Sequence, residues 1–256
     1  MQMFRTRRAA CPLPFRQQIV ALAATGLLGA CAAAPAPQVI NDPNEADNRE
    51  IHAFNRAIDS AILKPLTAGQ TGEPGLVGQG IGNFASNLDL PGAVVNNLLQ
   101  LRIGQAAENT LRFGVNTVLG IGGLFDPATA LGVEGRDSDF GETLHVWGAP
   151  EGAYVELPLL GPSTDRDTFG MVVDYALNPL RFVIPKPERS VVTAAGIAST
   201  LGDRGRYSET VDSILYDSAD SYAQARLLYL QNRRFELGQT SGDDDFEDPY
   251  EDPYAE

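Results

Sequence analysis

The chain has 256 residues and a formal net charge of −14. Its first thirty residues hold four arginines and no acid, so residues 31–256 carry a net charge of −18. A surface this acidic argues against nucleic acid as a partner and against an electrostatic attachment to anionic lipid. The length suffices for one large domain or two small ones.

The N-terminus has the three parts of an export signal. Four arginines give a positive first part, and Ile19 to Leu28 is an apolar stretch that is shorter than the roughly 20 residues needed to span a bilayer. It ends in Leu28-Gly29-Ala30-Cys31, which has the pattern of a lipobox. We therefore expect residues 1–30 to be a signal peptide and Cys31 to carry lipid. The alternative is an ordinary signal peptide that happens to contain a cysteine.

Ala32 follows the lipidation site, and the absence of Asp at this position predicts sorting to the outer membrane in many Gram-negative bacteria. The predicted location is the periplasmic side of that membrane. The other cysteine, Cys11, leaves with the signal peptide, so the mature domain is expected to have no thiol and no disulfide.

Composition divides the mature chain into three parts. Residues 31–41 combine the lipidated Cys with an Ala/Pro-rich stretch and predict a flexible tether, and residues 42–238 form the predicted domain. Residues 239–256 form an acidic tail in which the sequence Glu-Asp-Pro-Tyr occurs twice, and we expect it to be disordered.

Helical spacing dominates the predicted domain. The pattern predicts helices over Asn44 to Leu66, over Gln105 to Leu119 and over Glu209 to Leu237, and another that begins with Pro91 in its first turn. Tyr154 to Leu157 reads as a short extended segment. Five prolines are expected to break the region before the last helix into short pieces: Pro158, Pro162, Pro179, Pro185 and Pro187. The predicted fold is all-α, in a single domain with irregular connections.

Several predicted helices are rich in apolar and small residues, as in Gly92 to Val95 and Val115 to Phe125. No stretch of the mature chain reaches the 18 uncharged apolar residues of a membrane-spanning helix. Such helices either pack in a core or lie flat in a membrane interface. From periodicity alone the core is favoured.

The sequence contains no recognisable catalytic or cofactor motif. It has no Gly-x-Ser-x-Gly motif, and neither His52 nor His145 has a second histidine or a cysteine at metal-binding spacing. The glycines from Gly78 to Gly82 lack the spacing of a dinucleotide-binding loop. We therefore predict no enzymatic activity, no metal and no cofactor.

A series of motifs in one order along residues 42–236 resembles the VacJ/MlaA family of outer-membrane lipoproteins. Two residues depart from the family pattern: Asp47 stands where an aromatic residue is frequent, and Ser221 replaces a usual proline. The motifs that carry the resemblance are Asp42-Pro43-x-Glu45-x-x-Asn48-Arg49, Phe54-Asn55-Arg56, Gly82-Asn83-Phe84, Asn87-Leu88, Asn96-Asn97-Leu98-Leu99-Gln100, Arg112-Phe113-x-Val115-Asn116-Thr117-x-Leu119-Gly120-Ile121-Gly122-Gly123-Leu124-Phe125-Asp126, Asp139-Phe140-Gly141-x-Thr143-Leu144, Gly152-x-Tyr154-x-x-Leu157-Pro158, Gly161-Pro162-Ser163-x-x-Arg166-Asp167 and Asp217-Ser218-x-Asp220-x-Tyr222.

The resemblance implies a ring-like helical protein that is partly embedded in the inner leaflet of the outer membrane. It implies an amphipathic channel that removes mislocalised phospholipid from the outer leaflet and passes it to a soluble periplasmic carrier, with a trimeric porin as a membrane partner. Under this resemblance the small-residue helices face the membrane rather than a core.

The resemblance also implies roles for two groups of residues. Arg112, Asn116 and Asp126 are candidates for a polar path for the lipid headgroup, with helix-end and loop hydrogen bonds as the alternative. Gly148, Gly152 and Tyr154 match the loop that controls the channel, with an ordinary turn as the alternative.

The sequence thus leads to one main hypothesis, a phospholipid-transport lipoprotein that maintains lipid asymmetry. The first alternative is an envelope scaffold lipoprotein that binds only protein partners. A phospholipase-type hydrolase is the second alternative, and the absence of a recognisable nucleophile and base argues against it.

Overall fold

The computed structural model describes residues 40–70 and 72–239. The predicted signal peptide, Cys31, most of the predicted tether and all but the first residue of the predicted tail lie outside the described residues. Everything described belongs to one unit of the chain, residues 37–256.

The described residues are mostly helical, which confirms the predicted fold class, and one short β-hairpin is added to the helices. The elements in chain order are α2 (Glu45–Ile58), the π-helical turn η1 (Asp59–Leu63), α3 (Lys64–Thr67), α4 (Leu76–Leu99), α5 (Ile103–Val118), α6 (Pro127–Ala130), α7 (Phe140–Val146), β1 (Tyr154–Leu157), β2 (Gly161–Thr164), α8 (Asp165–Leu177), α9 (Leu180–Val183), α10 (Lys186–Arg206), α11 (Ser208–Asp212), the π-helical turn η2 (Ser213–Asp217) and α12 (Ser221–Glu236).

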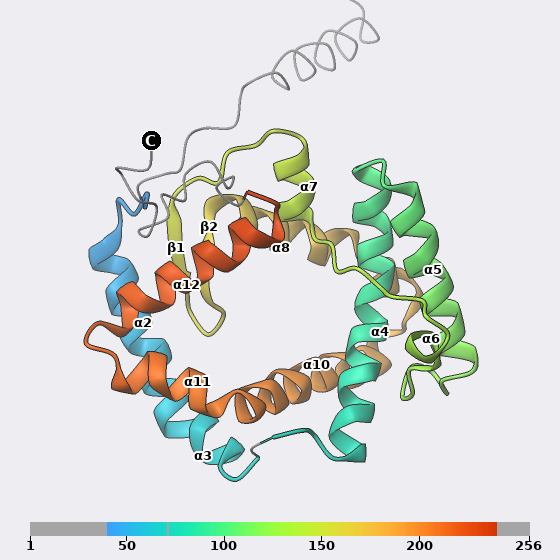
Figure 1. The fold of residues 1–256 in the computed structure, drawn as a ribbon, viewed down its shortest axis with the longest axis horizontal. Helices are drawn as coiled ribbons and strands as arrows, with labels where there is room; N and C mark the ends of the chain where they lie inside the picture. The colour runs from blue at the N-terminus through green and yellow to red at the C-terminus, as the bar shows by residue number, and fades with distance from the viewer. Residues whose placement is uncertain (1–39, 71, 240–256) are drawn as a thin grey trace, which may run out of the picture. The chain divides into compact units, whose positions relative to one another are not determined.

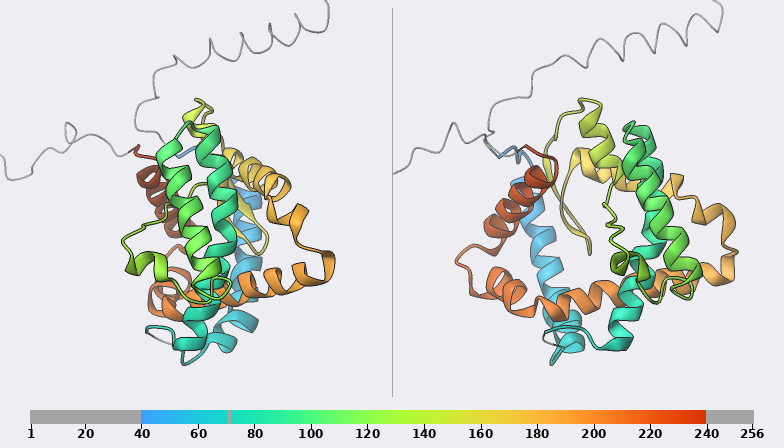
Figure 2. Two further views of the ribbon diagram at one scale, coloured as in Figure 1. Left: turned by 90° about the vertical axis from the view of Figure 1, so that its right-hand side faces the viewer. Right: turned by 45° about the vertical axis from the view of Figure 1, so that its right-hand side comes forward.

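Within this unit the helices follow one another around a ring (Figure 1). The long helices α4 and α5 lie side by side on one side of it, and α2, α12 and the hairpin β1–β2 form the other (Figures 1 and 2). Helix α10 runs between the two sides and packs against α4 and α3. Residues far apart in sequence therefore meet at both ends of α10.

The apolar core of this unit is small and lies beside the hairpin. Strand β1 pairs antiparallel with β2, with Tyr154 opposite Thr164. The ring of Tyr154 is 1% exposed and packs edge-to-face against Tyr222 and Tyr229 of α12, with centroid distances of 5.8 and 6.5 Å. Leu230 completes the buried cluster. Aromatic rings in this arrangement stabilise the fold through both burial and edge-to-face contact.

Ion pairs reinforce this small core. Arg49 of α2 donates two hydrogen bonds, of 3.0 and 2.8 Å, to the carboxylate of Asp220 at the start of α12. Arg204 at the end of α10 makes a two-pronged pair with Asp59 of η1, at 2.7 and 3.0 Å, and both side chains are less than a tenth exposed. Two-pronged guanidinium–carboxylate pairs fix orientation as well as distance. They join segments about 150 residues apart in the sequence.

One close helix contact requires glycine. A Cβ atom on Gly170 of α8 would lie 2.5 Å from the backbone nitrogen of Gly141 in α7. Because backbone cannot yield as a flexible side chain can, α7 and α8 can pack at this distance only with glycine at this position.

Pro91 was predicted to lie in the first turn of a helix, and this prediction is wrong. Helix α4 begins at Leu76 and runs through Pro91 to Leu99. A proline inside a helix removes one backbone hydrogen bond and crowds the carbonyl four residues earlier. The helix nevertheless continues, packed along its length against α5 and α10.

The predicted single helix from Glu209 to Leu237 is also wrong. The chain forms α11 and η2, leaves helical geometry at Ser218, and starts α12 at Ser221. The physical reason is the N-cap: the side chain of Asp220 accepts a hydrogen bond from the backbone N–H of Ala223 and so favours a new helix start.

The sequence analysis expected five prolines to break the region before the last helix into short pieces, and this prediction is wrong for α10. Pro187 lies in the first turn of α10, where proline favours helix formation, and the helix is 21 residues long.

Three other predictions are confirmed. The segment from Asn44 to Leu66 is helical, with π-helical geometry in η1, and the predicted helix from Gln105 to Leu119 corresponds to α5. The extended segment from Tyr154 to Leu157 is strand β1.

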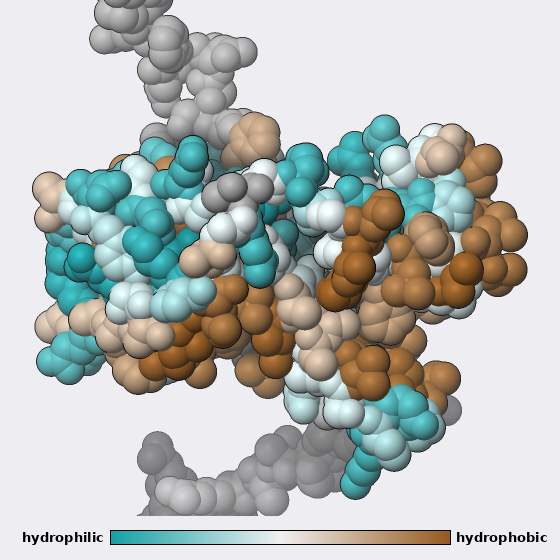
Figure 3. Space-filling view, turned by 90° about the horizontal axis from the view of Figure 1, so that it is seen from below, coloured by the Kyte–Doolittle hydropathy of each residue, from teal (hydrophilic) through white to brown (hydrophobic). Residues whose placement is uncertain are grey.

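Large apolar side chains are exposed over much of the side formed by α4, α5, α8, α9 and α10. In Figure 3 the left of the face is mostly hydrophilic, and hydrophobic residues gather at its centre and right. None of the helices in residues 40–70 and 72–239 is long and apolar enough to cross a membrane. The most exposed apolar residues on this side include Leu76, Val77, Leu101, Val118, Leu119, Ile121, Phe125, Val172, Phe182 and Val183.

Candidate functional site

A cleft of about 450 Å³ lies where α4, α5 and α6 meet the loop that follows α6. We call it the polar cleft, because only one of its lining residues is a large apolar one. It contains all three residues predicted for a polar path. Its lining residues are Asn83, Ser86, Asn87, Leu90, Arg112, Asn116, Asp126, Thr129, Glu134, Gly135 and Asp137.

Arg112, Asn116 and Asp126 form one hydrogen-bonded network in this cleft. Asn116 donates to one oxygen of Asp126 at 3.0 Å, and Arg112 pairs with the other. Thr129 adds a 2.7 Å hydrogen bond from its hydroxyl group. Asp126 is also the N-cap of α6, since its side chain accepts the backbone N–H of Thr129. The carboxylate therefore organises the start of α6 and one wall of the cleft.

The network keeps Asp126 ionised. Burial alone would raise the pKa of this carboxyl group, but hydrogen bonds from Thr129 and Asn116 and the positive charge of Arg112 lower it. The guanidinium group of Arg112 also donates a hydrogen bond of 2.7 Å to the backbone oxygen of Val133. The network thus fixes the loop after α6 against α5.

A glycine turn brings Asp126 back over α5. A Cβ atom on Gly120 would lie 2.3 Å from the backbone oxygen of Phe125 and 2.4 Å from that of Asn116. No side chain fits there, so the chain can reverse direction so tightly only with glycine. The backbone N–H of Phe125 donates to the oxygen of Gly120 at 2.9 Å and closes the turn.

The opposite wall of the cleft comes from α4, and this wall was missed as a site by the sequence analysis. Asn83, Ser86, Asn87 and Leu90 recur at the three- and four-residue spacing that places side chains on one helix face. Asn87 is 2% exposed and donates to Thr117 at 3.2 Å, but its side-chain oxygen has no hydrogen-bond partner. The signal was present in the family motifs as Gly82-Asn83-Phe84 and Asn87-Leu88.

The second predicted group, Gly148, Gly152 and Tyr154, does not line the polar cleft. Both glycines have positive φ, at 85° and 82°. Gly148 has open space around it, whereas a Cβ on Gly152 would lie 2.7 Å from Cβ of Asp165. The ring of Tyr154 is buried in the core, and its hydroxyl group bonds to Glu156. The segment is therefore free at its first glycine and tightly held at its end.

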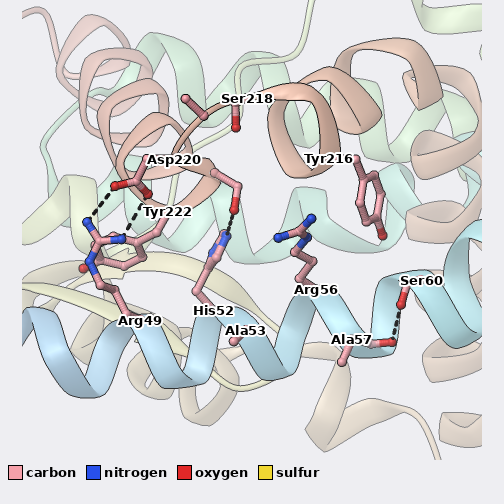
Figure 4. A pocket seen from close by; sticks show the side chains of 12 residues that line it. Arg49, His52, Ala53, Arg56, Ala57, Ser60, Tyr216, Ser218, Asp220 and Tyr222 are labelled. Carbon is pink, nitrogen blue, oxygen red and sulfur yellow. Dashed lines mark hydrogen bonds and ion pairs between the residues drawn. The ribbon is translucent and has the colours of Figure 1, made fainter.

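A larger cleft of about 690 Å³ separates α2 from η2 and the start of α12 (Figure 4). We call it the arginine cleft. The guanidinium group of Arg56 points across it to Tyr216, 5.3 Å from the ring centroid, and Arg49 is engaged by Asp220. Asp220 neutralises Arg49, whereas no described residue forms an ion pair with Arg56.

The structure joins three residues that the sequence analysis did not connect, and two of them, His52 and Ser221, line the arginine cleft. His52 lies with Nε2 3.1 Å from Oγ of Ser221 and Nδ1 3.3 Å from Oε1 of Glu156. Ser221 and Glu156 lie 169 and 104 positions from His52, so no local spacing in the sequence could reveal the three together.

In this group of three side chains a nucleophile, Ser221, contacts a base, His52. The backbone N–H groups nearby are nevertheless not placed to support ester hydrolysis. The first N–H groups of α12, from Tyr222 and Ala223, are directed at the carboxylate of Asp220. A hydrolase needs such donors free for the developing oxyanion. We therefore assign the three residues to holding α2, β1 and α12 together.

Within the described part of the chain, no group of three or more His, Cys, Asp or Glu residues is arranged to hold a metal ion.

Comparison with known proteins adds independent information. Residues 40–236 match the model of a family described as MlaA lipoprotein. An uncharacterized protein of Rickettsia bellii is 36% identical over 196 residues, which cover 76% of each chain. The protein of Escherichia coli K12 named "Intermembrane phospholipid transport system lipoprotein MlaA" is 31% identical over 228 residues, covering 87% of this chain and 89% of that protein.

A solved structure described as "Structural basis for maintenance of bacterial outer membrane lipid asymmetry" superposes with a TM-score of 0.65 at 29% identity. The match covers 77% of this chain and 98% of that chain. Similarity in sequence and similarity in fold thus each extend over about three quarters of the chain.

Proposed function

Because this chain belongs to the MlaA lipoprotein family, we propose that it is an outer-membrane lipoprotein that removes mislocalised phospholipid from the outer leaflet. The lipid would pass through the molecule toward a soluble periplasmic carrier, and lipid asymmetry would be maintained. The name of the Escherichia coli relative places that protein in intermembrane phospholipid transport.

The observation that carries this proposal is a polar cleft on the side of the molecule that exposes large apolar side chains. A phospholipid needs both surroundings at once, since moving its charged headgroup into hydrocarbon costs several kcal/mol or more. Asn83 and Ser86, which are not buried, offer neutral hydrogen-bonding groups to a headgroup. Exposed residues such as Leu119 and Phe125 offer contact to acyl chains.

The same apolar side chains support partial embedding in the inner leaflet. Soluble monomers rarely expose contiguous apolar patches larger than a few hundred Å². Leu101, Val118, Phe182 and Val183 are each more than three quarters exposed. Helices that lie in a leaflet without crossing it would cover these side chains with acyl chains. Lipid on Cys31 would hold the domain at this depth.

We propose that the segment from Gly148 to Tyr154 controls passage, with movement at its free end. Gly148 can change its backbone angles without a steric penalty from neighbours, while Tyr154 anchors the other end in the core. A Gly148→Ala substitution adds a side chain in open space but disfavours the positive φ of this glycine, so it should restrict the free end of the segment and reduce lipid passage with protein level retained. Normal passage would contradict the gating role.

The proposed partners are a trimeric porin in the membrane and a soluble lipid carrier in the periplasm. Crosslinking in cells followed by identification of the captured proteins tests both. Capture of neither protein would contradict this part of the proposal.

The decisive test of the function is deletion of the gene followed by measurement of outer-leaflet phospholipid. We expect more phospholipid in the outer leaflet and added sensitivity to detergent with chelator, both restored by the wild-type gene but not by Cys31→Ser. Unchanged asymmetry in the deletion strain would contradict transport and would favour a scaffold that binds only proteins.

A further inference from the structure

The polar cleft contains acidic side chains without partners. Glu134 and Asp137 line it, are exposed, and form no ion pair or hydrogen bond with any described residue. Asp89 of α4 lies close enough to Asp137 to sense its charge. Solvent reaches Asp89, but the protein atoms around it remove part of its hydration. This desolvation and the negative charge of Asp137 raise the pKa of Asp89.

The cleft has no spare positive charge to balance these acids. Arg112 is the only cationic residue that lines it. One of its terminal nitrogens donates to Thr129 and Val133, at 3.0 and 2.7 Å, and the other pairs with Asp126. Because Arg112 is neutralised by Asp126, no cationic side chain that lines the cleft is left to pair with Glu134 and Asp137, and Arg136 of the same loop does not line it.

A second, independent feature also calls for a hydrogen-bond donor. Asn87 lines the cleft, is 2% exposed, and leaves its side-chain oxygen without a partner. A buried acceptor without a donor costs free energy, so native proteins supply one from protein, water or ligand. The two carboxylates and the amide oxygen of Asn87 can thus all be satisfied by one ligand group that donates hydrogen bonds.

From these two features we propose that the polar cleft receives the primary ammonium group of a zwitterionic phospholipid such as phosphatidylethanolamine, in preference to an anionic phospholipid. An ammonium group brings positive charge and three N–H donors in a compact shape. An anionic headgroup would meet unbalanced carboxylates and no free cation. The inference rests on the proposed function, since it names the substrate class of the same cleft.

The test uses the full-length lipidated protein incubated with vesicles that contain equal amounts of phosphatidylethanolamine and phosphatidylglycerol with the same acyl chains. The protein is reisolated, and its bound lipids are measured by mass spectrometry. We expect about fivefold enrichment of phosphatidylethanolamine, the size of effect that one partly solvated ion pair provides. High salt should reduce the enrichment.

Substitutions distinguish the effect of the two acids in the cleft from the effect of the protein's overall negative charge on lipid binding. Glu134→Gln with Asp137→Asn should bring the ratio of the two lipids close to one, and Glu134→Lys with Asp137→Lys should invert it. Glu108→Gln is the matched control, because Glu108 is an exposed acid of α5 that does not line the cleft. This control should keep the wild-type ratio.

Two results would overturn the inference alone: equal amounts of both lipids on the wild-type protein, or an enrichment that survives both double variants. The recovery of neither lipid would overturn the proposed function and this inference together. The two failures are therefore distinguishable in one experiment.

Discussion

The two sides of the ring are built on different physical principles. We call residues 40–63, 151–167 and 204–236 the anchored half, and residues 76–131 and 168–200 the apolar half. The anchored half buries the tyrosine cluster around Tyr154 and two-pronged ion pairs such as Arg204–Asp59. The apolar half leaves residues such as Leu101 and Phe182 exposed.

This difference indicates two kinds of stability within one chain. Burial inside the protein holds the anchored half together in water, whereas the apolar half reaches its most favourable state only when another apolar phase covers it. Most of the residues that line the polar cleft, from Asn83 to Thr129, belong to the apolar half, and Glu134, Gly135 and Asp137 follow directly after it in the chain.

The largest expected effect comes from opening a buried ion pair in the anchored half. Arg204→Ala leaves the carboxylate of Asp59 buried without its cation, so we expect a loss of about 3–5 kcal/mol in the free energy of unfolding, measured by chemical denaturation. Arg206→Ala is the matched control, because its partner Glu73 is largely exposed, and it should cost less than about 1 kcal/mol. Equal losses in the two variants would contradict the distinction.

Substitution of apolar residues should affect the two halves differently. Leu230→Ser in the anchored half removes a side chain that is 2% exposed and should cost about 2–5 kcal/mol in the free energy of unfolding. Val118→Ser with Leu119→Ser in the apolar half should change it by less than about 0.5 kcal/mol in detergent-free buffer, because both side chains are exposed to water there. The same pair should weaken binding of the unlipidated protein to vesicles, and unchanged binding would argue against a membrane role for these residues.

The glycine turn shows that the apolar half also contains positions that tolerate no change. Gly120→Ala places a methyl group against two backbone oxygens, and we expect a loss of about 1–3 kcal/mol in the free energy of unfolding. Gly114→Ala within α5 is the control, since nothing lies within 4 Å of its added carbon and alanine favours a helix over glycine, so it should cost no stability. A loss of similar size in both variants would contradict the role of the tight turn.

The smallest expected effects concern pH. Burial alone would raise the pKa of Asp59, but hydrogen bonds from Arg204 and Tyr216 lower it below its ordinary value of 3.8. A lowered pKa in the folded state gives stability that is present above pH 3.8 and is lost as pH falls through the folded-state pKa. The melting temperature should therefore be flat from pH 7 to 5 and fall below pH 4, less steeply in Asp59→Asn.

Asp89 in the apolar half should behave in the opposite sense. Its pKa is raised, so the ionised carboxylate opposes folding at neutral pH. Asp89→Asn should raise the melting temperature slightly at pH 7 and leave it unchanged at pH 3. A lower melting temperature at pH 7 would contradict this.

The sequence predicted the family and the helical class, and it singled out three polar residues as candidates for one path, which the structure joins in one hydrogen-bonded network. Arg112, Asn116 and Asp126 lie within 14 positions, so one helix and one turn bring them together. The longest of the motifs that resemble the family, from Arg112 to Asp126, also contains all three residues.

The remaining features depend on contacts between distant segments. The chain of Ser221, His52 and Glu156 forms only when α12 closes against α2, so no local pattern contains it. Tyr154 was expected to belong to a channel-controlling loop, and its burial in the core depends on Tyr222 and Tyr229 some 70 positions later. The continuation of α4 through Pro91 likewise depends on packing against α5 and α10, which outweighs the local preference of proline for a helix start.

The most direct test of the central claim is site-specific photocrosslinking in living cells. A photoreactive amino acid replaces Ser86, which lines the polar cleft, or Asp47, an exposed residue of α2 in the anchored half. The account predicts that phospholipid becomes covalently attached at position 86 and not at position 47. Absence of lipid at position 86, with the variant protein present at normal levels in the outer membrane, would contradict it.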